Sequence, residues 1–350
     1  MQILLISNMG PKPSAPVQGQ FIEQQRQALP VVTDYHFMRW HQDTLLNRCF
    51  KYPLWALSFF WRYLCRRKTY QLLHVHFYYP TIWLAILYKL LRNRKVIIVV
   101  TCHGSDIYHY QPAGLGYRWC ARWVDQWIFT SSALQQRFFK PVRAACVLSA
   151  GIAADFGKAE PLSLTEKDID LLFVGSLDRN KGLDRLRRLL PQLTERRVVI
   201  IGQGAMQHEV QDWTRQYPNL QWLPTQSQTE LINWYRRSKV LLSLSRHESF
   251  GLVMTEALAC STPVIATVTD GSAAQLQADY AVLVAQPQQE DELTAKLLQA
   301  LQQLWQLPEP EYQRMQQRGR DYAQGQLLPA IAEQLFDLYQ QLQVNKDKAA

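Results

Sequence analysis

The sequence predicts an α/β fold in which two parallel sheets carry helices on both faces. Short apolar runs alternate with amphipathic segments of helical length along most of the chain, and the alternation starts again after a linker at residues 157–165. Parallel strands that are buried on both faces are continuous apolar runs, and helices connect them. Since 47% of the 350 residues are hydrophobic, each of two domains can bury its own core.

The first half of the chain supplies one predicted sheet. Its strands are apolar runs at residues 2–7, 72–77, 96–101, 126–130 and 145–148. A loop rich in Gly and Pro, residues 8–19, leads into a helix at 20–29, and a further helix starts at Thr81. These elements predict an N-terminal Rossmann-like domain over residues 1–160.

The second half repeats the pattern and predicts a second Rossmann-like domain over residues 161–325. Its strands are expected at residues 170–175, 197–202, 220–223, 239–244, 262–266 and 281–284. Amphipathic helices are expected at residues 183–190, 208–216, 228–237 and 251–260. A C-terminal helix within residues 326–350 is predicted to pack back toward the first domain.

The charge of the chain is unevenly distributed. Residues 1–160 contain 19 Lys and Arg against 7 Asp and Glu, a net charge of +12, whereas the remainder carries −3 of the total +9. The first domain therefore favours an acidic partner, such as anionic lipid, nucleic acid or a phosphorylated substrate. Six scattered cysteines without a C-x-x-C pair argue against a disulfide scaffold or zinc site, and the sequence indicates neither a signal peptide nor a transmembrane segment.

Glu248 and Glu256 bracket the most informative segment, where a strand is expected to run into the helix at 251–260. The free N–H groups and the positive dipole end of such a helix stabilise a phosphate, and Gly251 permits close approach to the backbone. Glu256 can accept hydrogen bonds from two vicinal sugar hydroxyls, and Glu248 can reach a hydroxyl further along the same ligand. The spacing alone leaves open that a glutamate here only stabilises the helix dipole.

Five loops follow predicted strands, and ligands of open α/β sheets bind beyond the carboxyl ends of strands. These loops lie at residues 8–19, 102–106, 176–182, 203–204 and 246–251. If the two domains face each other, the loops converge on one cleft.

Structural roles remain open for several loop residues. Lys181 could be a solvated turn residue, and Gly202 and Gly204 could be ordinary turn glycines. Asp106 could cap the next turn or orient His103, and Arg246 is expected at the surface.

Three segments resemble glycosyltransferase family 4. They are Val-Gly-Ser-Leu-Asp-Arg-Asn-Lys-Gly at 174–182, Ile-Ile-Gly-Gln-Gly at 200–204 and the run from Glu248 to Ala266, while residues 16–25 and Thr-Cys-His-Gly-Ser-Asp at 101–106 match more weakly. The resemblance implies the GT-B fold, with two Rossmann-like domains facing across a cleft. It also implies a hexosyltransferase-type enzyme that transfers sugar from a nucleotide-diphosphate sugar with retention of configuration, without a metal or other cofactor.

The resemblance also implies residue roles. Glu256 would bind the ribose, Glu248 the donor sugar, and Lys181 the phosphates, while His103 would lie against the donor sugar near the reacting carbon. Ser176 stands where the family often has an arginine, so Arg179 is assigned that role. The implied catalytic residues are His103, Lys181 and Glu248. The implied donor-binding residues are Gly19, Arg179, Lys181, Gly202, Gly204, Glu248, Phe250, Gly251, Leu252 and Glu256.

Residues 53–68 form a helix-length run of aromatic and apolar residues that ends in basic ones. Such a helix suits a bilayer interface, with aromatic rings at headgroup depth and cations on anionic lipid. The predicted membrane residues are Trp55, Trp61, Arg62, Arg66, Arg67 and Lys68. The alternative is an ordinary buried helix with a basic last turn.

Together these features predict a cytoplasmic glycosyltransferase at the inner face of the cytoplasmic membrane. Its expected partners are a nucleotide-diphosphate sugar, most simply a UDP-sugar, and a glycan or lipid-linked acceptor in lipopolysaccharide or surface polysaccharide biosynthesis. Two alternatives are an epimerase of sugar nucleotides on the same fold and a non-enzymatic basic protein that binds nucleic acid. No recognised nucleic-acid motif supports the latter, so nucleic acid is not an expected partner.

Overall fold

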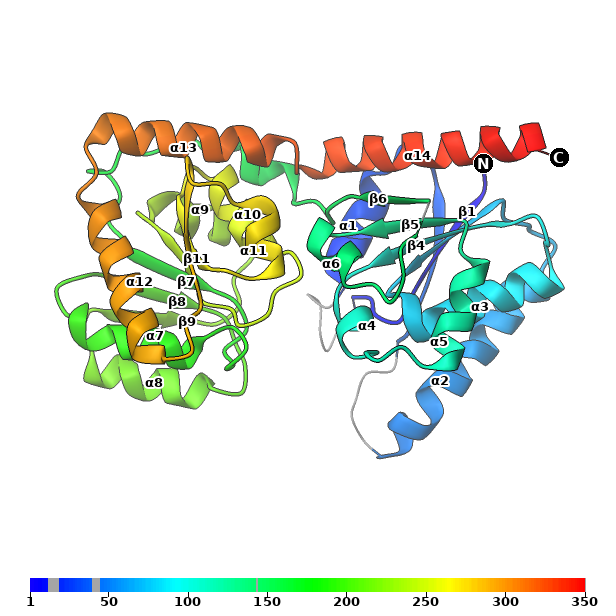
Figure 1. The fold of residues 1–350 in the computed structure, drawn as a ribbon, viewed down its shortest axis with the longest axis horizontal. Coiled ribbons are helices and arrows are strands. Elements are labelled where there is room, and N and C mark those ends of the chain that lie inside the picture. The colour runs from blue at the N-terminus through cyan, green and yellow to red at the C-terminus, as the bar shows by residue number, and fades with distance from the viewer. Residues whose placement is uncertain (12–18, 40–44, 143, 350) are drawn as a thin grey trace. The chain divides into compact units, whose positions relative to one another are not determined.

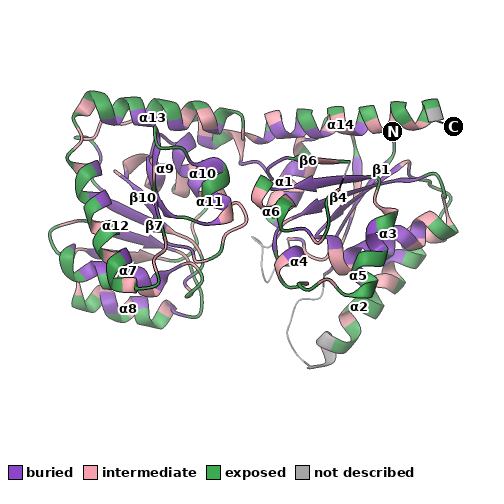
Figure 2. Ribbon diagram, viewed as in Figure 1, coloured by how far each residue is buried: buried purple, intermediate pink, exposed green. Residues whose placement is uncertain are grey.

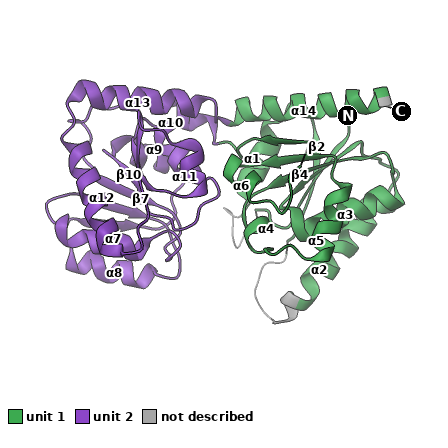
Figure 3. Cartoon of the chain, in the orientation of Figure 1, with its two compact units in different colours: residues 1–151, 328–350 green, residues 152–327 purple. Residues whose placement is uncertain are grey.

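A computed structural model describes residues 1–11, 19–39, 45–142 and 144–349, so residues 12–18 of the predicted 8–19 loop lie outside the described part. The chain forms two compact units (Figure 3). Unit 1 comprises residues 1–151 and 328–350, and unit 2 comprises residues 152–327. Each unit has its own six-stranded sheet with flanking helices (Figure 1), which confirms the predicted α/β class.

The sheet of unit 1 is entirely parallel, in the order β2-β1-β3-β4-β5-β6. Its strands are β1 (Ile3–Ser7), β2 (Thr33–Phe37), β3 (Leu72–His76), β4 (Ile97–Cys102), β5 (Gln126–Phe129) and β6 (Ala145–Val147). The sequence analysis missed β2, whose residues Thr-Asp-Tyr-His-Phe are not a continuous apolar run. An edge strand pairs on one side only and tolerates such polar residues.

Helices cover both faces of this sheet. They are α1 (Gln20–Ala28), α2 (Leu45–Phe59), the π-helical turn η1 (Phe60–Leu64), α3 (Tyr78–Leu91), α4 (Ser105–Tyr108), α5 (Leu115–Cys120), α6 (Ser132–Gln136) and α14 (Leu328–Ala349). Ile331 and Leu335 of α14 are buried in the same apolar cluster as Leu5 of β1. Tyr339 lies fully buried, with its hydroxyl 2.5 Å from Nδ1 of His74 on β3. The C-terminal helix is therefore part of the core of unit 1.

The sheet of unit 2 is also parallel, in the order β12-β11-β10-β7-β8-β9. Its strands are β7 (Leu171–Val174), β8 (Val198–Ile201), β9 (Leu220–Leu223), β10 (Leu241–Ser243), β11 (Val264–Thr267) and β12 (Ala281–Val284). All six coincide with predicted apolar runs. The helices are α7 (Leu183–Leu189), α8 (Gln207–Gln216), α9 (Gln228–Arg237), α10 (Leu252–Ala259), α11 (Asp270–Gln275), α12 (Glu290–Trp305) and α13 (Glu309–Gln324).

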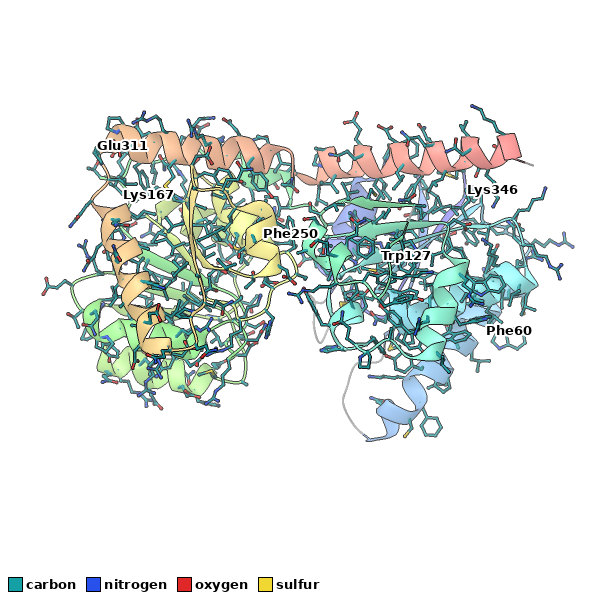
Figure 4. The ribbon with its side chains drawn as sticks, in the orientation of Figure 1. Phe60, Trp127, Lys167, Phe250, Glu311 and Lys346 are labelled. Carbon is teal, nitrogen blue, oxygen red and sulfur yellow. The ribbon has the colours of Figure 1, made fainter. Side chains whose placement is uncertain are left out.

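A buried lysine fastens two of these helices. The ammonium of Lys167 (Figure 4) donates to the carbonyl oxygens of Arg236 at 2.7 Å, Ser238 at 3.0 Å and Ser261 at 3.3 Å, and only 2% of the residue is exposed. Arg236 and Ser238 lie at the end of α9, and Ser261 follows the end of α10. Because helix ends leave carbonyls without intrahelical partners, this one cation satisfies groups of two helices and fixes their positions.

Candidate functional site

The N-terminus of α10 is a backbone site that remains open to an anion. Gly251 is its N-cap with φ 85°, and the first turn contains no acidic side chain. A Cβ at Gly251 would lie 2.6 Å from Cε of Met254 and 3.0 Å from Cγ of Glu248, so a side chain is excluded there. The amide groups that start the helix at Leu252 have no carbonyl of their own helix to bind, which leaves them for a ligand.

The loop before this helix is held in place by α11. The amide of Gly271 donates to the carbonyl of Glu248 at 2.8 Å, and the side-chain amide of Gln275 donates to the carbonyl of Phe250. A Cβ at Gly271 would lie 2.6 Å from the backbone nitrogen of Phe250, which lies beside α10 and α11 (Figure 4). The backbone that would meet a ligand is therefore positioned before the ligand arrives.

Lys181 and Glu248 come from two different loops and form an ion pair through Nζ and Oε2. Their side chains retain 27% and 15% exposure, so both can still reach a ligand. The turn that carries Lys181 is fixed by Gly182, where a Cβ would lie 2.2 Å from the carbonyl oxygen of Leu244 at the end of β10. An incoming phosphate would compete with Glu248 for the Lys181 ammonium.

Glu256 projects from α10 toward α9. Its Oε2 accepts a hydrogen bond of 2.8 Å from the hydroxyl of Tyr235, which is fully buried. Burial raises the pKa of Glu256 to about 7, and the Tyr235 hydrogen bond opposes that rise. Sequence reasoning did not find Tyr235, because no local pattern links it to a glutamate 21 residues further on.

Arg246 is not the surface residue that the sequence suggested. Its guanidinium makes two 2.9 Å bonds to Asp184 at the start of α7 and one of 3.0 Å to Glu290 at the start of α12. Glu290 also accepts from the buried Arg185 at 2.9 Å. This network joins the loop before α10 to two helices, so Arg246 positions the Glu248 loop.

Gly202 and Gly204 permit the loops after β7 and β8 to touch. A Cβ at Gly202 would lie 1.9 Å from the carbonyl oxygen of Gly175, and one at Gly204 would lie 2.6 Å from that of Leu177. Both glycines thus have a structural requirement that is independent of any ligand. Arg179 is exposed on the turn that precedes Lys181.

His103 follows β4 in unit 1. Its Nε2 lies 3.1 Å from Nδ1 of His76, and its ring centroid lies 5.1 Å from that of Phe21 and 4.5 Å from that of Phe77. Burial lowers the pKa of His103 to about 3, so the imidazole is neutral near pH 7. It can therefore donate or accept a hydrogen bond but brings no charge to a ligand.

Asp106 acts on the backbone around this histidine. Its carboxylate accepts from the amides of His103 at 3.0 Å, Gly104 at 2.9 Å and Tyr78 at 2.8 Å. The N-cap of α4, Gly104, has no side-chain cap hydrogen bond, so of the two roles left open by the sequence these contacts support the one that orients His103, through its backbone. Gly19, the N-cap of α1 with φ 68°, lies near Gly10, because a Cβ on Gly19 would be 2.9 Å from its Cα.

The predicted membrane helix corresponds to α2 and η1, and one of its residues was assigned wrongly. Trp55 is only 3% exposed and stacks on His36 at a centroid distance of 5.6 Å, so it belongs to the core. Trp61 is 63% exposed, and the four predicted basic residues Arg62, Arg66, Arg67 and Lys68 are also exposed. Lys68 forms an ion pair with Asp34.

The described residues contain neither a helix that could span a membrane nor a metal-binding cluster. None of the helices in those residues is long and apolar enough to span a bilayer. No cluster of three or more His, Cys, Asp or Glu side chains with metal-binding geometry occurs among residues 1–11, 19–39, 45–142 and 144–349.

Two family models match consecutive parts of the chain. The model described as glycosyl transferases group 1 matches residues 158–322, and the model described as glycosyltransferase family 4 matches residues 21–155. An uncharacterized glycosyltransferase of Methanocaldococcus jannaschii is 25% identical over 239 residues, which are 66% of this chain and 65% of that protein. A D-inositol 3-phosphate glycosyltransferase of Saccharomonospora viridis is 29% identical over 230 residues, 59% of this chain and 48% of that protein. The alignments thus span about half to two thirds of these curated relatives.

Solved structures share the whole fold. Sucrose-phosphate synthase from Thermosynechococcus elongatus has a TM-score of 0.74 at 19% identity, covering 99% of this chain and 100% of that one. HepE of Anabaena, solved in complex with UDP-glucose, has a TM-score of 0.70 at 14% identity, covering 97% and 100%. At these identities the likeness establishes the architecture of the two sheets and their helices.

Proposed function

The chain belongs to glycosyltransferase family 4, with the GT-B fold, and from this premise we propose that it transfers a sugar from a nucleotide-diphosphate sugar to a glycan or lipid-linked acceptor. One observation carries the proposal: Lys181, Glu248 and Glu256 are held around the open N-terminus of α10. These groups offer a cation and amides for a diphosphate and two carboxyl groups for hydroxyls. In this proposal unit 2 binds the donor and unit 1 binds the acceptor.

We propose one orientation for the donor. The amides from Gly251 onward and the Lys181 ammonium take the diphosphate, Glu256 accepts hydrogen bonds from the ribose hydroxyls, and Glu248 accepts one from the sugar. We propose a UDP-sugar as the donor. Supporting this choice, HepE was solved with UDP-glucose, and the pneumococcal O-GlcNAc transferase GtfA, a further structural neighbour at a TM-score of 0.62, was solved with UDP and GlcNAc.

The proposed reaction retains the configuration of the anomeric carbon. The bond from that carbon to the diphosphate oxygen breaks, and the acceptor oxygen forms its bond on the same face. The acceptor's proton passes to the departing diphosphate oxygen, so no side-chain base is required. Lys181 and the α10 amides stabilise the charge that develops on the diphosphate. Transfer should therefore persist in the presence of a metal chelator.

The proposed acceptor and the proposed location of the enzyme rest on features of unit 1. We place the enzyme at the inner face of the cytoplasmic membrane, in lipopolysaccharide or surface polysaccharide biosynthesis. The excess of basic residues before residue 160 and the exposure of Trp61 support an anionic membrane surface as a partner.

Calorimetry with UDP-glucose tests the donor site. We expect Glu256→Ala to raise the donor Kd about 100-fold, because two hydrogen bonds to a charged acceptor are lost. Glu311→Ala, at an exposed glutamate of α13 (Figure 4), is the matched control and should bind as wild type does. Equal affinity of the two variants would contradict the assigned role of Glu256.

Product analysis separates the other functions. Incubation with the donor alone should give no epimer, whereas an epimerised sugar nucleotide would favour the epimerase. Binding to DNA without binding to anionic vesicles would favour the nucleic-acid protein. A transferred sugar whose anomeric configuration is inverted would refute the retaining mechanism.

A further inference from the structure

Two neighbouring hollows lie beside η1 in unit 1 and share Arg62 as a wall. The larger, of about 530 Å³, is bordered mainly by charged and tyrosine side chains that include Asp34, Arg66 and Lys68. The smaller, of about 200 Å³, is bordered by Arg39, Trp55 and His36 among others. None of these residues has a role in the donor site of unit 2.

The larger hollow carries an excess of positive charge. Its one carboxylate, Asp34, is already bound by the Lys68 ammonium and the Tyr70 hydroxyl. Arg62 and Arg66 are exposed and form no ion pair within the described part of the chain. Two guanidinium groups in one hollow match the paired oxygens of a phosphate, which planar N–H forks bind better than single cations do.

The two arginines lie at the end of the π-helical turn. In η1 the amide of Cys65 donates to the carbonyl of Phe60 at 3.2 Å, five residues back. Arg62 lies in this turn and Arg66 follows its end, and both border the larger hollow. Turns of this kind are frequent at functional sites.

The smaller hollow contains polar atoms that lack partners. Nε1 of Trp55 and Nε2 of His36 are buried and have no hydrogen-bond partner among the described residues. The two residues are 3% and 5% exposed. An indole N–H can only donate, and a buried donor without an acceptor is costly, so this wall of the smaller hollow carries an energetic cost within the fold.

An exposed apolar stripe runs along α2 and into η1, where Arg62 borders both hollows. Figure 2 shows the exposed residues of α2. Phe50, Leu54, Leu57 and Trp61, spaced at helical intervals, are 55%, 43%, 52% and 63% exposed. Trp61 directly precedes Arg62, and Phe60, also exposed, lies at the same end (Figure 4). A ligand that carries both an anionic group and an apolar chain matches this combination of stripe and hollow.

We propose that the Arg62–Arg66 hollow binds the phosphate group of an anionic membrane lipid while the α2 stripe lies in the bilayer interface. The inference deepens the membrane part of the proposed function and rests on it. It commits to a specific headgroup site instead of a diffuse basic surface. Its ligand is the lipid phosphate, held by the two guanidinium groups.

Co-sedimentation with vesicles tests the proposal. We expect wild type to bind phosphatidylcholine vesicles that contain phosphatidylglycerol, and the double variant Arg62→Ser/Arg66→Ser to bind about 30-fold more weakly, at roughly 1 kcal/mol for each arginine. The matched control is Arg94→Ser/Lys95→Ser, which removes the same charge from exposed positions of unit 1 outside the hollow. We expect the control to lose less than about threefold, because salt screens a diffuse contribution. Equal losses in the two double variants, or no loss in either, would overturn the headgroup site.

A second variant separates binding from folding. Arg62→Lys/Arg66→Lys keeps both exposed charges but removes the planar N–H forks, so we expect an unchanged Tm together with weaker binding to phosphatidylglycerol vesicles. Vesicle binding equal to that of wild type would show that charge alone carries the interaction, without a headgroup site. UDP-glucose affinity should be unchanged in all these variants. The vesicle experiments can therefore contradict the lipid site while the donor site is supported, and calorimetry can do the reverse.

Discussion

The candidate sites of the two units differ in whether their charged side chains are paired. In unit 2, Lys181 pairs with Glu248, and Arg246 bridges Asp184 and Glu290, so the loops around α10 are braced without a ligand. In unit 1, Arg62 and Arg66 border a hollow without an acidic partner of their own among the described residues. Internal pairing preorganises a site for a small ligand with fixed geometry. Unmatched charge beside exposed apolar residues instead suits a fluid surface.

The largest expected effect is on kcat, when the positive charge of Lys181 in unit 2 is removed. Lys181→Ala should lower kcat about 100- to 1000-fold, since one preorganised group that stabilises developing charge contributes on that scale. Steady-state kinetics with UDP-glucose measure it. Lys158→Ala, at an exposed lysine of the same unit, is the control. Full activity of Lys181→Ala would mean that the pairing with Glu248 is only structural, which would break the contrast between the units.

The next effect concerns the scaffold. Lys167→Met leaves the carbonyls of Arg236 and Ser238 without this donor, while Ser261 keeps its 2.8 Å bond from Gln316, and should lower the free energy of unfolding by about 3 kcal/mol. Thermal denaturation measures this, with Lys296→Met at an exposed position of α12 as the control. Vesicle binding by the folded variant should stay at the wild-type level, because the stripe and hollows belong to unit 1. A Tm equal to that of the control would show that neither helix end depends on this ammonium.

The smallest effect is a pH dependence confined to the donor site. Glu256 accepts from ribose hydroxyls best as a carboxylate, and burial raises its pKa to about 7, so donor affinity should rise between pH 6 and pH 8. The raised pKa also links Glu256 to the stability of the fold. Protonated Glu256 contributes its full stabilisation below the ordinary pKa of 4.5, and this stabilisation is lost as the pH rises through about 7.

Tyr235→Phe sharpens this prediction. Two titratable groups lie near Glu256: Tyr235 on α9, and Cys260 at the C-terminal end of α10, the helix that carries Glu256. Burial raises the pKa of both. Loss of the Tyr235 hydrogen bond, which favours the carboxylate, should move the pH profile of UDP-glucose binding upward by about one unit. Calorimetry across the pH range measures this shift. An equal loss of affinity at every pH would instead indicate that Tyr235 only packs.

The strands and phosphate-binding turns could be predicted because their signals are local. Apolar runs mark all six strands of unit 2, a glycine beside Lys181 marks the turn at Gly182, and a glycine ahead of an apolar helical run marks the turn at Gly251. β2 was missed because an edge strand need not be apolar. Tyr235 and Arg246 were missed because their partners are distant in sequence and become neighbours only in the folded sheet.

The misassignment of Trp55 has a different cause. α2 is apolar on two opposite sides, with Trp55 and Phe59 facing the core and Leu54, Leu57 and Trp61 facing outward. Periodicity finds the core side of a helix by contrast with a polar side, and here both sides are apolar. Which stripe is buried depends on the packing partners, such as the His36 ring, and those partners are not encoded in the helix itself.

The place of α14 has a consequence for how the chain folds. Unit 2 is one continuous stretch, whereas unit 1 needs Ile331, Leu335 and Tyr339 from α14 to close the core that begins with β1. Without α14, unit 2 still has all of its residues, while residues 1–151 keep an apolar face uncovered. A chain truncated before residue 328 should therefore contain a native unit 2 and a protease-sensitive unit 1.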